Sequence, residues 1–224
     1  MVRYNGPVNL RKLTKALLWT AFLLGIVGVA LRLLLVRTWT VPSDDSALSA
    51  SIAPTLAPDD FVVLLHAVAP GFGDLVRCTD PDEPRRWVIA RIVGEGGDSI
   101  EINQGRLIIN GQSAPLEHAC LEPQIQVPDP NTGSPVELRC DMENLSGTVH
   151  PRASGVRENF SVAAPVKRRV PPGFFYLVSD NRFNHFDSRI YGAVPVETCD
   201  TRIILRLWGV KGLGDTDTRM TWIN

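Results

Sequence analysis

A dense polar segment near the end of the chain reads Ser179-Asp180-Asn181-Arg182-Phe183-Asn184-His185-Phe186-Asp187-Ser188-Arg189-Ile190-Tyr191-Gly192. The apolar run 174–178 comes directly before it, and Pro171-Pro172-Gly173 comes before that run. An apolar run between turn residues is typical of a buried strand. The charged and amide groups that follow cannot be buried unpaired without a large cost in free energy. The pattern therefore predicts a buried platform of ion pairs at the end of a core strand.

The same segment resembles a motif of the bacterial type I signal peptidases, GDNRxxSxDSRxxGxV, with Ser179 for the first glycine and His185 for the inner serine. Residues 46–56 (SALSASIAPTL) resemble the nucleophile motif of that family, SxSMxPTL, with Ile52 in place of methionine. Residues 73–77 resemble its GDxV turn and strand, and residues 90–98 resemble its KRxxGxPGD motif. The resemblance runs in motif order over residues 16–208 and indicates a divergent member of the family.

The resemblance implies an all-β, mostly antiparallel protease domain with an inserted β subdomain at about residues 100–170, preceded by one transmembrane helix. Apolar and β-branched runs independently predict strands at 61–65, 174–178 and 202–208. A hairpin is expected around Asn103-Gln104-Gly105, with a second turn at Asn110-Gly111. Residues 113–166 are weakly patterned, and we assign them to the variable part of the insertion.

An apolar segment near the amino terminus, residues 16–35, is broken mainly by Arg32. Twenty helical residues span about 30 Å, the thickness of a bilayer core. Residues 1–15 carry only basic charges, so they are expected in the cytoplasm, with Trp39 as an anchor at the opposite interface. A cleaved signal peptide is the alternative, but its apolar region usually covers only about 7–15 residues.

These features predict a single-pass protein of the inner (cytoplasmic) membrane. Residues 1–15 form the cytoplasmic tail, 16–36 the anchor, and 37–224 a periplasmic or extracellular peptidase-like domain. The partners expected are the lipid bilayer, preproteins that bear signal peptides, and possible components of the secretion machinery. A net charge of -1 offers no basic excess for nucleic acid, so none is expected.

Four cysteines, Cys78, Cys120, Cys140 and Cys199, follow no zinc-binding spacing, and we expect no metal and no cofactor. In an exported domain one or two disulfides are expected. Cys120 and Cys140 bracket a proline-rich segment and are the favoured pair. The alternative is four unpaired, buried thiols.

By the resemblance, Ser51 is the nucleophile, and Ser49 is the hydroxyl that helps the Ser51 backbone N–H to hold the oxyanion. The structural platform implied by the motif comprises Asp180, Asn181, Arg182, Ser188 and Arg189. The bacterial family uses a Ser–Lys dyad, but Ala90 stands at the lysine position. Arg91 cannot replace the lysine because a guanidinium does not release its proton at usable pH. Lys12 and Lys15 are expected on the cytoplasmic side, and Lys167 and Lys211 lie in no matched motif.

His185 remains as the candidate base. Its position in the family holds a serine that hydrogen-bonds the catalytic lysine, so the resemblance places its imidazole beside the space vacated at Ala90. An imidazole is a competent base near neutral pH, and Asp187 is expected to orient it as the third member of a triad does. The endoplasmic-reticulum relatives of the family also use histidine, at the lysine's own position. The other histidines, His66, His118 and His150, lie outside every motif and receive no role.

Two functions follow from these residues. One is a membrane-anchored serine endopeptidase that removes signal peptides from exported preproteins. The other is a catalytically inactive module that binds preproteins or an assembly partner. The intact Ser49/Ser51 pair favours the first function, and the missing lysine favours the second.

Overall fold

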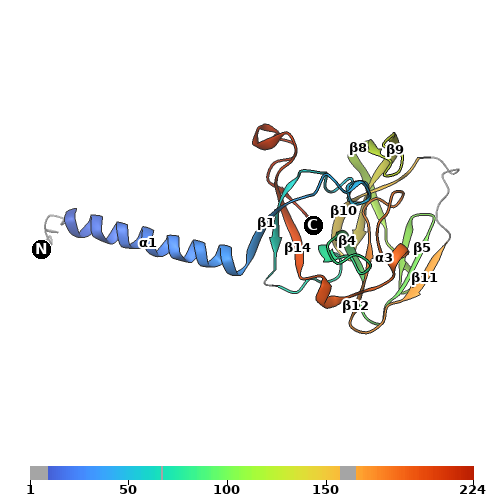
Figure 1. Cartoon of the computed structure of the whole chain (residues 1–224), viewed down its shortest axis with the longest axis horizontal. Helices are drawn as coiled ribbons and strands as arrows, with labels where there is room; N and C mark the ends of the chain where they lie inside the picture. The colour runs from blue at the N-terminus through green and yellow to red at the C-terminus, as the bar shows by residue number, and fades with distance from the viewer. Residues whose placement is uncertain (1–9, 67, 157–164) are drawn as a thin grey trace, which may run out of the picture.

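The computed structural model describes residues 10–66, 68–156 and 165–224 of the chain. One long helix, α1 (Leu10–Leu34), projects from a β-rich body (Figure 1). Its segment Arg11–Arg32 is long and apolar enough to cross a membrane, with a mean hydropathy of 1.8 and none of its side chains buried. The Arg32 guanidinium turns toward the body and donates to Thr38 Oγ1 at 2.8 Å. Residues 1–9 of the predicted tail lie outside the described residues.

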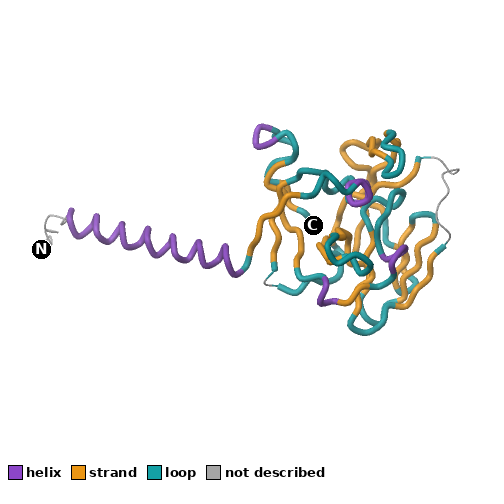
Figure 2. The backbone as a smooth tube through the Cα atoms, viewed as in Figure 1, coloured by secondary structure: helices purple, strands orange, loops and turns teal. Residues whose placement is uncertain are grey.

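The body consists of strands joined by loops, with a few short helical turns (Figure 2). The strands are β1 (Val36–Thr40), β2 (Phe61–Leu65), β3 (Leu75–Thr79), β4 (Trp87–Gly94), β5 (Ser99–Asn103), β6 (Arg106–Ile109), β7 (Gln112–Ser113), β8 (Leu116–Pro128), β9 (Pro135–Leu145), β10 (Thr148–Gly155), β11 (Val166–Arg169), β12 (Phe174–Val178), β13 (Val194–Pro195), β14 (Thr201–Trp208) and β15 (Thr221–Trp222). The helical turns are α2 (Ser46–Ser51), α3 (Ser188–Tyr191), η1 (Val196–Thr198) and η2 (Gly212–Gly214).

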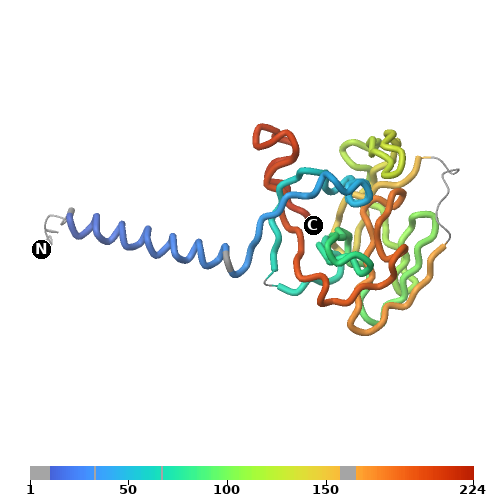
Figure 3. Tube along the Cα trace, in the orientation of Figure 1, coloured from blue at the N-terminus to red at the C-terminus, as the bar shows by residue number. Residues whose placement is uncertain are grey.

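Three antiparallel sheets form the body. The main sheet has the order β1-β2-β14-β3-β4-β12-β13, with β15 added to β14. The colours of Figure 3 show how the last strands of the chain return beside the first, and β14 indeed pairs with β2. Between β4 and β12, which pair with each other, the chain forms a sheet β10-β9-β8 and a sheet β11-β5-β6-β7. The predicted all-β fold with an inserted β subdomain is confirmed.

Strand β4 separates two apolar clusters and so decides which side chains face the site. Ile89 belongs to the cluster that contains Leu48 and Ile52, at the two ends of the turn that carries Ser51. Ala90 and Ile92 belong to the cluster on the opposite face. Because side chains alternate along a strand, Arg91 shares the face of Ile89. Ala90, at the predicted lysine position, and the neighbouring Arg91 therefore point to opposite sides of the sheet.

Two disulfides join the four cysteines. Cys120–Cys140 links β8 to β9 within the insertion, which confirms the favoured pair. Cys78–Cys199 closes a sequence separation of 121 residues within the main sheet. No described cysteine is free, and neither bridge joins the insertion to the main sheet.

Trp39, the expected interfacial anchor, contacts the body of the molecule. It is a β1 residue paired with Val62, and its half-buried indole packs against the apolar cluster of the main sheet. The Arg77 guanidinium lies 5.1 Å from its ring centroid. The indole thus takes part in packing within the body, and its role as an interfacial anchor stays a prediction.

Candidate active site

Helix α2 positions Ser51 as its last residue. The helix begins at Asp45, whose Oδ1 accepts a hydrogen bond from the Leu48 N–H at 2.9 Å, as a helix N-cap does. Ser51 is fully buried, and its hydroxyl donates to the Leu48 carbonyl at 2.9 Å. Asn181 holds the end of the helix, since its N–H donates to the Ser51 carbonyl (3.1 Å) and its side chain to the Ala50 carbonyl (2.8 Å). The platform and the Ser51 segment are thus in direct contact.

The Ser49 hydroxyl of α2, unlike that of Ser51, is left without a hydrogen bond in the described part of the chain. Its hydroxyl oxygen is buried and has no hydrogen-bond partner among the described residues. Buried polar groups are normally paired, so an unpaired hydroxyl calls for an explanation. A donor left free in the unliganded protein can serve a charge that develops only during a reaction.

Asp180 is the centre of the platform. Arg91 donates to both of its carboxylate oxygens, from Nε at 3.1 Å and from Nη2 at 3.0 Å, and Thr55 Oγ1 donates at 2.5 Å. Burial raises the pKa of Asp180, but Arg91 and then His150 lower it by more, so the pKa lies well below its ordinary value. Arg91 also donates to the carbonyls of Gly73, at 2.7 Å, and Asn224. The Arg91 guanidinium therefore has a structural role, since its Nε, Nη1 and Nη2 atoms all donate hydrogen bonds.

Asp187 forms the second ion pair of the platform, with Arg189. The Arg189 Nη2–Asp187 Oδ2 distance is 2.6 Å, and the same oxygen accepts from the Ser179 N–H at 2.7 Å. Burial raises the pKa of Asp187, but the charge and hydrogen bonds of Arg189 lower it by more, so the net pKa is about 2. Ser188 contributes its hydroxyl, which accepts from the Leu177 N–H at 2.9 Å.

His185 lies half-buried in the loop between Asp180 and Asp187. Its Nδ1 is 3.3 Å from the Phe183 carbonyl. In the described chain no hydrogen bond joins His185 to Asp187 or to Ser51, so Asp187 acts on the ring through its charge. Burial and then Arg189 lower the pKa of His185 below 6.5, while Asp187 opposes them. The side chain of the adjacent Phe186 packs against the Ala90 cluster.

His150, in the insertion, lies outside every motif, and its contacts were not predicted. The ring is 1% exposed, with Nδ1 3.3 Å from Asp180 Oδ1 and Nε2 3.4 Å from Glu143 Oε2. Glu143 also pairs with Arg182, and with Arg152 at 3.5 Å. Burial raises the pKa of Glu143, but Arg182 and its neighbours lower it to about 2. His150 is the cross-strand partner of Glu143 in the β9–β10 pair, whereas Asp180 and Arg182 come from a distant segment, so no local pattern could reveal the contact with the platform.

Backbone hydrogen bonds continue this contact between the insertion and the platform. The Ala153 N–H donates to the Asp180 carbonyl at 2.9 Å, and the Arg182 N–H donates to the Ala153 carbonyl at 2.8 Å. The β10 strand is therefore fastened beneath the same residues that hold Ser51.

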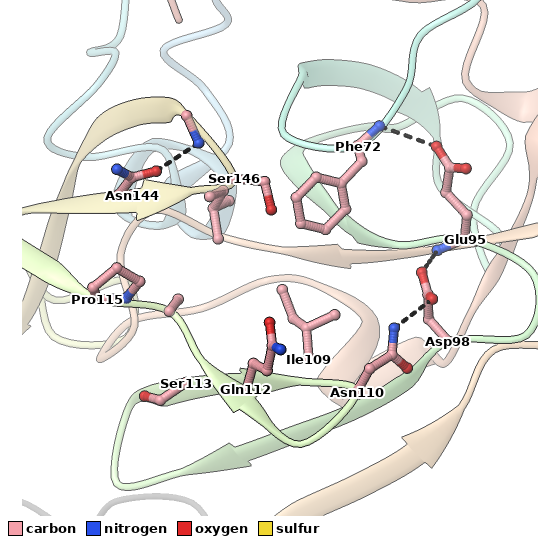
Figure 4. A pocket seen from close by; sticks show the side chains of 13 residues that line it. Phe72, Glu95, Asp98, Ile109, Asn110, Gln112, Ser113, Pro115, Asn144 and Ser146 are labelled. Carbon is pink, nitrogen blue, oxygen red and sulfur yellow. Dashed lines mark hydrogen bonds between the residues drawn. The ribbon is translucent and has the colours of Figure 1, made fainter.

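Two pockets lie on the body outside the predicted site residues. One, of about 510 Å³, is lined by α2 and by the start of β4. Another, of about 570 Å³, lies between the β6–β7 hairpin and the turn after β9, and contains none of the predicted site residues (Figure 4). Its carboxylates are already used, since Glu95 accepts from the Phe72 N–H and Asp98 accepts from Asn110 Nδ2. The pocket beside α2 is lined by Ser46 and Leu48 of that helix, and its lining does not include Ser49, Ser51 or His185.

The family model for signal peptidase, peptidase S26, matches residues 13–208, most of the chain. This chain belongs to the peptidase S26 signal peptidase family. Signal peptidase I of Leptolyngbya laminosa is 25% identical over 202 residues, covering 85% of this chain and 77% of that protein. Signal peptidase I of Aquifex aeolicus is 25% identical over 219 residues, covering 85% and 82%. A solved signal peptidase I structure from Enterococcus faecalis matches 59% of this chain and 95% of its own, at 18% identity and a TM-score of 0.39.

The family match confirms the family that the motifs predicted, which is a family of peptidases. The replacement of the catalytic lysine by Ala90 and the roles of individual residues stay predictions.

Proposed function

We propose that this family member is a membrane-anchored serine endopeptidase that removes signal peptides from exported preproteins, with Ser51 as its nucleophile. The observation that carries the proposal is the arrangement of α2. Asn181 hydrogen-bonds the Ser51 segment, and the neighbouring Ser49 hydroxyl is buried without a partner. The names of the relatives, signal peptidase I, support the substrate class.

The reaction begins when the Ser51 hydroxyl leaves the Leu48 carbonyl and attacks the scissile carbonyl of a bound preprotein. The Ser49 hydroxyl and the Ser51 N–H stabilise the oxyanion that forms. His185 accepts the serine proton and returns it to the departing amine. Water then attacks the acyl-enzyme, with His185 again as the base. The lowered pKa of His185 supports this role, because it keeps the ring neutral at pH 7.

The rival proposal is a non-catalytic module that binds signal-peptide segments or an assembly partner. Two observations favour it. Ala90 lies in an apolar cluster, and in the described residues no base is hydrogen-bonded to the Ser51 hydroxyl.

The topology belongs to the same proposal. Residues 1–15 lie in the cytoplasm, 16–36 span the inner membrane, and 37–224 lie outside, where preproteins and the secretion machinery meet the domain. The apolar α1 helix supports this arrangement, although it begins at Leu10 and so takes in part of the basic segment.

A cleavage assay on the full chain in detergent micelles tests the proposal. The wild type and Ser113→Ala, a substitution of an exposed serine in β7, should both cleave a preprotein, while Ser51→Ala should not. Cleavage by Ser51→Ala would overturn the assignment of the nucleophile. Binding of preprotein by the wild type without any cleavage would establish the rival module.

A further inference from the structure

One side chain, Arg86, joins three segments of the candidate site. It precedes β4, and its guanidinium binds both oxygens of Asp45, from Nε at 2.6 Å and from Nη2 at 2.8 Å. The same guanidinium lies 4.0 Å from the ring centroid of Phe186, the residue after His185. The Ser51 helix and the His185 loop are therefore both fastened to one cation.

The Asp45 contact matters because α2 is a helix of only 6 residues. So short a helix is not stable by itself, and it depends on its cap and on packing. Burial raises the pKa of Asp45, but the hydrogen bonds from Arg86 and Leu48 lower it by more, so the net pKa is lowered. The cap is thus a charged carboxylate whose orientation Arg86 determines.

The contact between Arg86 and Phe186 restrains the loop that carries His185. A guanidinium over an aromatic face is attracted to the ring and restricts where the ring can lie. Phe186 also packs against the Ala90 cluster, so its position limits that of the adjacent imidazole. The side chains of Arg86 and Asp45 retain 27% and 20% of their exposure, and such a pair contributes little to global stability. Its contribution is to geometry.

The geometry points to Arg86 as a positioning residue for the peptidase reaction, one that holds the Ser51 helix and the His185 loop at a fixed separation. The inference rests on the proposed function. It gives Arg86 a role through Asp45 and Phe186, without contact between Arg86 and the reacting atoms.

Arg86→Met, which keeps the stem and removes the guanidinium, tests it. The value of kcat on a preprotein should fall about 10- to 100-fold, because misplacement of reacting groups by about 1 Å costs that much. KM should change little. Arg86→Lys should recover only part of kcat, because one ammonium cannot bind both oxygens of Asp45 and cover the ring. Arg139→Met is the control, since it removes an arginine–aspartate pair in the insertion whose arginine is 60% exposed.

Amide hydrogen exchange supplies a readout that needs no activity. In Arg86→Met the amides of 46–51 and of 184–188 should both exchange faster, while the melting temperature and the insertion stay as in the wild type. Asp45→Asn keeps an oxygen for the Leu48 N–H and should loosen 46–51 more than 184–188. Unchanged exchange in either segment of Arg86→Met overturns the inference, as does unchanged or increased kcat. A wild type that cleaves nothing refutes the proposed function alone, because the exchange result still decides the role of Arg86.

Discussion

The platform contacts the residues that we propose as the catalytic edge, but the polar groups of the two regions are paired differently. The platform comprises Asp180, Asn181, Arg182, Ser188 and Arg189 with their partners Arg91 and Asp187, and its carboxylates are fully paired and buried. The catalytic edge comprises Ser49, Ser51 and His185. There one hydroxyl has no partner in the described chain, and the imidazole is half-buried. Carboxylates held in ion pairs resist movement, whereas a hydroxyl without a partner has a hydrogen bond to offer a ligand.

This contrast predicts that substitutions at the edge abolish activity and leave the fold intact. Ser51→Ala and His185→Ala should each reduce cleavage about 10²- to 10⁴-fold, and the double variant should lose little more, because the two groups act as a unit. Preprotein cleavage and thermal melting would be measured on the same samples. Near-full activity in His185→Ala, with activity lost in Ser51→Ala, would remove His185 from the mechanism.

A rebuilt dyad sharpens the same test. Ala90→Lys alone should not restore or raise activity, since the new ammonium would enter an apolar cluster while His185 remains. Ala90→Lys with His185→Ser re-creates the family's pair and should shift the pH optimum upward. Cleavage by this double variant, in the absence of cleavage by the wild type, would favour the inactive module.

Substitutions in the platform, in contrast to those at the edge, should destabilise the fold. Asp180→Asn leaves Arg91 buried without its counter-charge, and breaking a buried pair in this way costs about 3–5 kcal/mol. Denaturant titration gives the free energy of unfolding directly. The matched comparison is Asp74→Asn, which removes a partly exposed pair with Arg202 and should cost about 1 kcal/mol or less. Equal losses in the two variants would contradict the proposed division.

Much of this organisation could be predicted from the chain itself. Apolar runs such as 61–65 and 174–178 specify strands locally, and the Asp187–Arg189 ion pair lies within one motif. The ion-pair partners of Asp180 and Arg182 come from distant segments instead. The contacts of His150 and Glu143 could not be predicted, because their inward orientation depends on how the insertion docks. The direction of Ala90 was also missed. The motif identifies a position along β4, but the alternation of the strand assigns that position to the face opposite Arg91.

Gly96 marks another departure that only the structure explains. The family motif has proline there, but a Cβ on Gly96 would lie 2.8 Å from the Cα of Pro172, in the turn before β12. Backbone atoms cannot give way cheaply, so Gly96→Pro should destabilise the fold by about 1–3 kcal/mol, as overpacking does. Gly97→Ala is not a clean comparison because Gly97 has a φ of +104°. Gly214→Ala is the better control, since its Cβ would meet nothing within 4 Å. A stabilised Gly96→Pro variant would show that the turn moves freely.

The smallest expected effect is a shift in the pH dependence of the cleavage rate. An imidazole of pKa 6.5 would be half protonated at pH 6.5, but burial and Arg189 lower the pKa of His185. Lowering pH to 6.5 should therefore reduce the cleavage rate by less than about twofold, with the main loss at lower pH. The platform responds in a different window. Glu143 and Asp187 have their pKa values depressed to about 2, so the unfolded chain binds protons first and stability declines as pH falls from about 4.5 toward 2. Activity should consequently disappear, and return on neutralisation, while far-ultraviolet circular dichroism still reports the folded domain. If activity and the dichroism signal fall together, the edge and the platform titrate as one unit and the distinction between them is lost.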